Sequence, residues 1–355
     1  MDPVSESLAA QANSVRTTEG PRAPEAVSWQ TAMKRAIRSA EVLCQRLELP
    51  AEFNRRVAEA APGNPFPVFV PLEFLSRMRP GDCRDPLLRQ VLPLPEEGDT
   101  AAGFSTDPVG ELQGSPAASL SVGLLRKYHG RALLVASGAC GVHCRYCFRR
   151  HFPYDTVPHG DAAWDQPLAM LSDDPTLDEV ILSGGDPLVL TDPALENLIR
   201  RVAEVPHVRR LRIHSRLPIV IPQRITERLL DLLRGTRLST WMVVHANHPT
   251  ELDAATLAAL GRLVDRGIPV LNQAVLLRGV NDQLAALEQL CRTLVDHRVQ
   301  PYYLHQLDRV AGAAHYEVPV ARGRQLVAEL RTRLPGYAVP TYVVEQAGEP
   351  SKTPL

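Results

Sequence analysis

The sequence predicts an α/β protein built on a partial (β/α)6 barrel, with a mostly helical N-terminal region packed on the barrel. After residue 130, six short apolar runs alternate with longer segments of helical periodicity, which is typical of βαβ units and a parallel sheet. Six repeats are too few for a closed eight-stranded barrel and too many for a small doubly wound domain. The expected strands are RALLVAS, EVILSGG, VRRLRIHS, TWMVVHA, PVLNQAVLL and QPYYLHQ, and the expected helices cover about 192–204, 224–234, 251–266, 283–297 and 319–333.

The chain divides into three parts by composition. Residues 1–27 are polar and rich in Ser, Ala, Glu and Pro, which predicts a flexible tail. In residues 28–125, apolar side chains first recur at helical spacing over about 29–49, and a Pro- and Gly-rich stretch of short helices and extended connectors follows. Cys44 lies on the apolar stripe and is expected in the core. Residues 126–355 form the barrel and a C-terminal segment.

The charge balance excludes several classes of protein. Lys plus Arg number 39 and Asp plus Glu 40, so the net charge of −1 offers no electrostatic footprint for nucleic acid or a membrane surface. No apolar run approaches the roughly 18 residues that a membrane-spanning helix needs, and the N-terminus shows no secretory signal. We therefore expect a cytoplasmic protein, whose reduced cysteines serve metals or catalysis.

Three cysteines follow the first expected barrel strand. Cys140, Cys144 and Cys147 are spaced C-x3-C-x2-C on a loop at the end of the strand where barrel active sites lie. A [4Fe–4S] cluster usually takes four cysteines, so three would leave one iron for an outside ligand. The alternative from spacing alone is a structural zinc site completed by His143 or His151.

The second expected strand ends in Gly184, Gly185 and Asp186. Glycines let backbone approach a ligand closely, and a carboxylate accepts hydrogen bonds from an ammonium group. By itself this sequence is also typical of a turn that ends a strand. Its position beside the cysteine loop favours a ligand site.

The cysteine spacing, with Tyr146 before the last cysteine, resembles the signature of radical S-adenosylmethionine (SAM) enzymes, in which SAM chelates the free iron. Over about residues 63–355 the chain resembles the lysine 2,3-aminomutase family, and within it the branch linked to β-lysylation of elongation factor P. The runs that carry this resemblance include DPLLRQVLP, CRYCFRR, ILSGGDPL, LRIHSRLPIVIPQRIT, HANHP, QAVLLRGVND, PYYLHQLD and GEPSKTPL.

The resemblance implies a [4Fe–4S] cluster, SAM and pyridoxal 5′-phosphate (PLP) as cofactors. It implies that the protein is an isomerase that moves the amino group of L-lysine from C2 to C3. The product, (R)-β-lysine, would be attached to a lysine of elongation factor P by a partner ligase. A catabolic lysine 2,3-aminomutase is the alternative, and a non-catalytic regulator that binds an iron–sulfur cluster or zinc is the alternative from another class.

The resemblance also implies roles for individual residues. The PLP site would use Lys352, which forms the Schiff base, with Tyr128, Arg131 and Lys127 around the ring and phosphate. The substrate carboxylate would bind Arg149, and its distal ammonium would bind Asp308 and Glu345, although the catabolic enzymes have Asp at the second position. The SAM-binding residues would be Gly184, Gly185, Asp186, Ser215, Arg216, His245, Asn247 and Gln273.

The zinc site of the catabolic enzymes is not expected here. In those enzymes a cysteine follows the segment GVND, whereas this chain has Gln283 after Asp282. We therefore expect no zinc and a weaker or different oligomer, with a homodimer compatible with the sequence.

Overall fold

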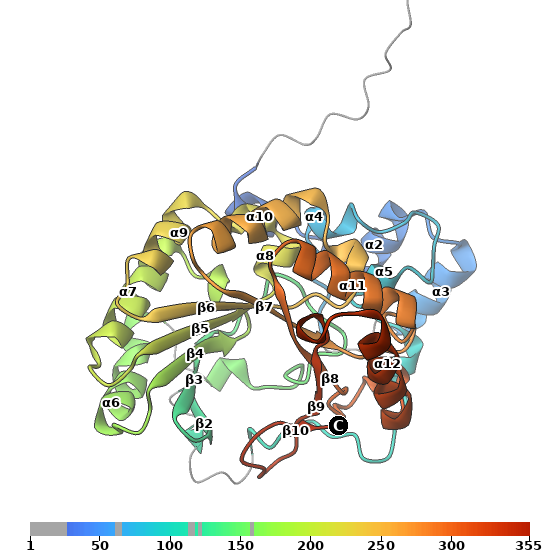
Figure 1. Cartoon of the computed structure of the whole chain (residues 1–355). Coiled ribbons are helices and arrows are strands. Elements are labelled where there is room, and N and C mark those ends of the chain that lie inside the picture. Colours follow the sequence, from blue (N-terminus) through green and yellow to red (C-terminus); the bar gives the residue numbers. More distant parts are fainter. Residues whose placement is uncertain (1–26, 61–65, 113–117, 120–122, 157–159) are drawn as a thin grey trace, which may run out of the picture.

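A computed structural model of the chain describes residues 27–60, 66–112, 118–119, 123–156 and 160–355 (Figure 1). The expected tail, residues 1–27, lies outside these ranges apart from Val27. The chain forms a ten-stranded sheet in which spatial order follows sequence order from β1 to β10.

The six expected strands all form, and they pair with one another in parallel. They are β3 (Arg131–Ser137), β4 (Glu179–Gly184), β5 (Arg210–Ser215), β6 (Ser239–Val244), β7 (Val270–Val275) and β8 (Gln300–His305). A seventh parallel strand, β9 (Thr341–Val344), extends the sheet beyond the prediction. Its four residues are too short a run to stand out as a repeat in the sequence. The antiparallel strands β1 (Ala118–Ser119), β2 (Leu124–Tyr128) and β10 (Thr353–Pro354) complete the two edges.

Helices line the outside of the curved sheet (Figure 1). They are α6 (Asp165–Asp173), α7 (Asp192–Glu204), α9 (Glu227–Arg234), α10 (Ala254–Asp265), α11 (Leu284–Asp296) and α12 (Val320–Arg333), with the short buried α8 (Leu217–Val220) after β5. The last five long helices match the predicted ranges within three residues, because each has a clear apolar stripe facing the sheet. Helix α6 was not predicted. The structure thus confirms an α/β partial barrel.

The N-terminal region contains α1 (Trp29–Lys34), α2 (Ala40–Arg46), α3 (Ala51–Ala60), α4 (Leu72–Leu75) and α5 (Pro86–Arg89). The apolar side chains at helical spacing over 29–49 belong to two helices, α1 and α2, with a break between them. Ile37 forms an antiparallel bridge with Val70, with backbone hydrogen bonds of 2.8 and 2.9 Å, so the helix stops before it. Ser39 then caps α2 through its hydroxyl, which accepts from the Val42 N–H. Cys44 is buried on α2, as expected.

The N-terminal region also anchors the cysteine loop through hydrogen bonds and an ion pair. The backbone N–H groups of His143 and Arg145 donate to the carbonyls of Phe69 and Gln90 at 3.0 and 2.9 Å. Buried Glu97, in η2 (Pro95–Gly98), accepts from the Arg145 guanidinium at 2.6 and 2.8 Å. A buried charge needs such partners, so the N-terminal region and the loop depend on each other.

None of the helices in the described ranges combines the length and the apolar content that crossing a bilayer requires.

We expect that replacing two helical glycines with alanine has opposite effects on the free energy of unfolding. A Cβ on Gly323, in α12, would run into the Tyr342 ring on β9, so Gly323→Ala should lower the free energy of unfolding by about 1–3 kcal/mol. Gly261, in α10, has open space around its Cα, so Gly261→Ala should raise it by about 0.5–1 kcal/mol. Urea unfolding of both variants measures this difference, and equal effects would contradict the packing of α12 on β9.

Candidate active site

The three cysteines of the loop after β3 are free thiols and lie close to one another. Burial, and then the neighbouring Cys147 and Cys144, raise the pKa of Cys140 well above its usual value. Burial and Cys144 likewise raise the pKa of Cys147 to about 12. In the described part of the chain, no three His, Cys, Asp or Glu side chains converge closely enough to hold a metal ion. Three thiols on one loop are nevertheless the donor type that an iron–sulfur cluster uses, and the positive charge of such a cluster would favour loss of the thiol protons.

His143 and His151, the alternative zinc ligands, are directed at carbonyl groups away from the thiols. His143 Nδ1 lies 3.0 Å from the Pro67 carbonyl oxygen, and the His143 ring stacks on Phe66 with centroids 5.3 Å apart. His151 Nε2 lies 3.0 Å from the Ala311 carbonyl oxygen. Neither imidazole joins the cysteines in a group that could hold a metal ion.

A buried polar network lies against the cysteine loop. Arg216 Nη1 donates to Cys144 Sγ at 2.7 Å, and Arg216 Nη2 donates to Gln90 Oε1 at 2.6 Å and Glu251 Oε2 at 2.9 Å. Burial by itself would lower the pKa of Arg216, but Cys144 and the other acidic groups around it raise that pKa well above its usual value. The guanidinium is therefore a fixed positive charge beside the Cys144 thiol.

Tyr146 connects this network to two more of the predicted SAM residues. Its hydroxyl lies 2.8 Å from His245 Nε2 and accepts from Asn247 Nδ2 at 2.6 Å. Asn247 also donates to Gln90 Oε1 at 2.9 Å. Burial lowers the pKa of His245 well below its usual value, so this imidazole is neutral. Arg216, His245 and Asn247 thus come together below the cysteine loop.

The Gly184–Asp186 turn packs against the start of that loop. The N–H groups of Gly185 and Asp186 donate to the carbonyls of Ser137 and Ala139, both at 2.7 Å. A Cβ on Gly184, whose φ is +110°, would lie 2.7 Å from the Ser137 oxygen, and a Cβ on Gly185 would overlap the Ala139 carbonyl. The glycines are therefore required by the close approach of two backbone segments.

The Asp186 carboxylate is fully used within the protein. It accepts from Ser215 Oγ at 2.7 Å and from the N–H groups of Leu188, Arg216 and Leu217 at 3.0, 2.8 and 2.9 Å. These four donors use the lone pairs of the Asp186 carboxylate, which was predicted to accept from a ligand ammonium. Burial nevertheless raises its pKa above the usual value. Asp186 and Ser215 therefore join the ends of β4 and β5. Gln273, the remaining predicted SAM residue, lies on β7 opposite Tyr303.

The predicted PLP residues gather around one carboxylate. Glu345 follows β9 and accepts from Tyr128 Oη at 2.5 Å, and it forms ion pairs with Lys127 at 2.5 Å and with Lys352. Burial would raise the pKa of Glu345, but Lys352 and Lys127 lower it to about 2. Glu345 is therefore ionised, and the Lys352 ammonium shows that it binds cations.

Arg131 lies across the β2–β3 hairpin from Tyr128. Its guanidinium carbon stacks 4.7 Å from the centroid of the Tyr128 ring. Its Nε is buried and has no hydrogen-bond partner. An unsatisfied buried donor is costly unless a ligand completes it, and an arginine suits a phosphate in this role.

Asp308 contains another unsatisfied group. Its Oδ1 is buried without a hydrogen-bond partner. Burial and then the Glu345 charge raise its pKa to about 7, against the lowering effect of Lys352 and Lys127. The Lys352 charge also acts on His305. Burial and this charge lower the pKa of His305 to about 3. A second carboxyl group near Glu345, with one oxygen that has no hydrogen-bond partner, suits a bound ammonium group.

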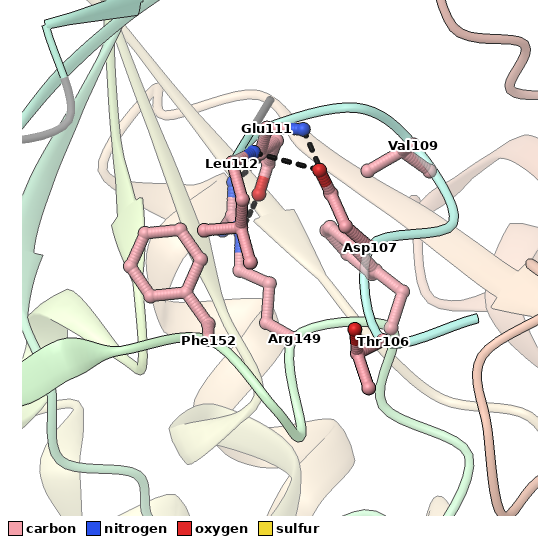
Figure 2. Close-up of a pocket in the computed structure, with 8 residues that line it drawn as sticks. Thr106, Asp107, Val109, Glu111, Leu112, Arg149 and Phe152 are labelled. Carbon is pink, nitrogen blue, oxygen red and sulfur yellow. Dashed lines mark hydrogen bonds and ion pairs between the residues drawn. The ribbon is translucent and has the colours of Figure 1, made fainter. Parts of the chain in front are cut away.

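Arg149 is paired with a residue that the sequence analysis did not find (Figure 2). Its Nε and Nη2 donate to the two carboxylate oxygens of Glu111, both at 2.7 Å. Glu111 lies in the Pro- and Gly-rich region, where no periodicity or motif marks it. Gln90, Glu97 and Glu251 were also missed, because only the fold brings them to the cysteine loop.

A partial barrel with three cysteines spaced C-x3-C-x2-C after its first parallel strand defines the class of radical SAM enzymes. The chain is 45% identical over 332 residues to the L-lysine 2,3-aminomutase of Escherichia coli K12, which covers 94% of this chain and 95% of that protein. It is 36% identical over 330 residues to the enzyme of the same name from Clostridium subterminale, covering 92% and 77%. The chain belongs to the lysine 2,3-aminomutase family, as predicted.

Two further comparisons add little to this assignment. No family model matches the chain. A radical SAM methyltransferase from Sphaerobacter thermophilus is 20% identical, with a TM-score of 0.44 over 62% of this chain and 68% of that one. This likeness is too distant to carry an argument.

Replacing Asp308 with Asn should have opposite effects on stability and on ligand binding. Because the folded-state pKa of Asp308 is about 7 and its usual value is 3.8, wild-type stability should fall as the pH rises from about 4 to 7. Unliganded Asp308→Asn should then melt higher than wild type at about pH 8, and the difference should vanish near pH 4. Lysine affinity should fall about tenfold or more, because the acceptor for the distal ammonium can no longer carry a negative charge. Calorimetry of melting and of binding tests both effects, and lower stability at pH 8 would contradict the assigned environment.

The Gly185 contact should control cluster loading. Gly185→Ala should lose most of the iron that wild type retains after anaerobic reconstitution, because the added Cβ displaces the Ala139 carbonyl at the start of the cysteine loop. Gly336→Ala is the matched control, since nothing lies within 4 Å of its Cβ position. Iron per chain and visible absorbance measure the outcome, and equal loading of the two variants would contradict this role.

Proposed function

We propose that the protein is a radical SAM aminomutase that uses PLP and converts L-lysine to (R)-β-lysine. The observation that carries this proposal is the acidic pair Asp308 and Glu345. One of these carboxylates already binds a lysine ammonium, and the other has a buried oxygen without a partner. Both interact electrostatically with Lys352, the proposed PLP lysine. Family membership supports the reaction, and the acids support lysine as the substrate.

The chain offers a set of residues for each cofactor. Cys140, Cys144 and Cys147 would hold the cluster, and Lys352 would bind PLP, with Arg131 directed to its phosphate. When bound, the cluster and SAM would supply a hydrogen-abstracting radical, and PLP would supply a carrier for the migrating amino group. SAM would bind next to the cysteine loop, near the residues around Arg216 and His245.

The remaining residues would position the substrate. Arg149 would bind the α-carboxylate, and Asp308 and Glu345 would bind the distal ammonium, so that the chain of lysine is held at both ends. His305 stays neutral at physiological pH because of burial, so it adds no positive charge to repel that ammonium. Phe148 and Phe152 cover the Arg149 guanidinium and limit the access of water.

We further propose that the β-lysine is attached to elongation factor P, in line with the branch that the sequence resembles. In the catabolic alternative the product would be released for degradation. Incubation with elongation factor P and its lysyl ligase distinguishes them, because only the first predicts a β-lysyl-protein by mass spectrometry. A purely regulatory iron–sulfur protein would form no β-lysine at all.

The test is turnover by anaerobically reconstituted protein with SAM, PLP, dithionite and L-lysine. We expect β-lysine and 5′-deoxyadenosine from wild type, neither from Cys147→Ala, and no β-lysine from Lys352→Ala. Lys352→Ala should also lose the PLP absorbance band, whereas Lys34→Ala, at an exposed position on α1, should keep both band and activity. Absence of both products from cluster-loaded wild type would refute the proposal.

A further inference from the structure

The guanidinium of Arg149 is held by an internal carboxylate. Glu111 binds the Nε–Nη2 edge with both oxygens at 2.7 Å, which is the bidentate geometry of a carboxylate ligand (Figure 2). The rings of Phe148 and Phe152 lie 4.8 and 5.8 Å from the guanidinium carbon.

The other edge of the guanidinium is not open to a second carboxylate. Arg149 Nη1 donates to Ser183 Oγ at 3.2 Å and to the Gly184 carbonyl oxygen at 3.3 Å, which uses both of its hydrogens. A bidentate carboxylate can therefore bind only the edge that Glu111 covers. Two carboxylates cannot share that edge, because their like charges repel each other.

Glu111 is presented by a turn that caps the pocket. Asp107 accepts from the N–H groups of Glu111 and Leu112, both at 2.8 Å, and this closes the turn (Figure 2). The turn is tied to the barrel at Ser105, which exchanges backbone hydrogen bonds of 2.9 and 2.8 Å with Arg309 and Ala311. The pocket between the turn and Arg149 has room for about one water molecule, far less than an amino acid needs.

We infer that Glu111 occupies the place of the substrate carboxylate on Arg149, and that an amino acid binds there only when Glu111 withdraws. This inference rests on the proposed function, since it takes Arg149 as the carboxylate site. Glu111 keeps the buried cation paired in the absence of substrate, and each substrate carboxylate must compete with it.

This competition has a distinct thermodynamic signature. The apparent association constant of a ligand equals its intrinsic value multiplied by the fraction of molecules in which Arg149 is free of Glu111. That factor is the same for every ligand that binds through its carboxylate, whatever its other groups. A ligand without a carboxylate does not use the edge and escapes the factor. If Glu111 instead stayed in place and oriented Arg149, its removal would weaken carboxylate binding.

Glu111→Gln tests the inference with three ligands. The amide keeps the shape of the side chain but loses the charge and one of the two acceptor atoms, so only its oxygen can accept from Arg149, through a weaker neutral hydrogen bond. The protein is loaded with cluster, PLP and SAM without reductant, and binding is measured by calorimetry. The ligands are L-lysine, L-norleucine, which lacks the distal ammonium, and cadaverine, which lacks the carboxylate. We expect lysine and norleucine to bind about tenfold more tightly, by the same factor, and cadaverine to be unchanged.

Two further variants complete the test. Glu196→Gln, in an exposed ion pair with Arg228 on the outer helices, is the matched control and should leave all three affinities unchanged. Asp107→Asn should loosen the turn and tighten lysine binding in the same direction by a smaller factor. As a second readout, unliganded Glu111→Gln should melt below wild type, and saturating lysine should raise its Tm by more than that of wild type.

The outcomes separate this inference from the proposed function. If wild type binds lysine and Glu111→Gln binds it no more tightly than wild type does, the inference is overturned and the proposed function still stands. So would a gain shared by cadaverine, because it would point to a general opening of the site. If loaded wild type and Glu111→Gln both fail to bind lysine, the proposed substrate falls and the inference with it.

Discussion

The Asp186 carboxylate is the contact on which the arrangement of the site depends. It accepts the Ser215 hydroxyl and the backbone N–H groups of Arg216 and Leu217, and so it ties the end of β4 to the chain that leaves β5. This orients the Arg216 side chain toward Cys144, Gln90 and Glu251. The loss of any of these donors would leave part of a buried negative charge without a hydrogen bond, which is costly. The donors therefore hold this arrangement in place.

Around this contact, three separate parts of the chain meet at the cysteine loop. The N-terminal region contributes Glu97 and Gln90, and the barrel contributes Glu251 from η8 (Pro249–Glu251), which follows β6. Each is buried, and each bonds an arginine beside the thiols. The loop is thus fixed from both sides by charges that cannot be exposed or left unpaired. This rigidity suits a site that must hold a cluster and a second ligand in constant relation.

The charged groups of the site are largely satisfied by one another. Glu111 supplies a carboxylate to Arg149, and Lys352 supplies an ammonium to Glu345. These are the two kinds of charge that a lysine zwitterion would bring. Arg131 Nε and Asp308 Oδ1 are among the buried atoms that remain without hydrogen-bond partners. A donor and an acceptor left buried in one site are the groups that a phosphate and an ammonium would complete.

The sequence by itself determined the fold class, the three-cysteine loop and the family, because these depend on local periodicity and on residues that are close in the chain. It located six of the seven parallel strands and five of the helices that cover them, and it missed β9 and α6, whose apolar runs are short. The partners of the site residues were decided only by the tertiary structure. Glu111 lies 38 residues from Arg149 and Gln90 lies 126 from Arg216 along the chain. The structure also shows a structural role for Asp186 and the two glycines before it, which join the end of β4 to the cysteine loop and to the chain after β5, while their contact with SAM stays a prediction. Such pairings arise from the burial of charge, which forces each ionised group to find a partner wherever the fold brings one.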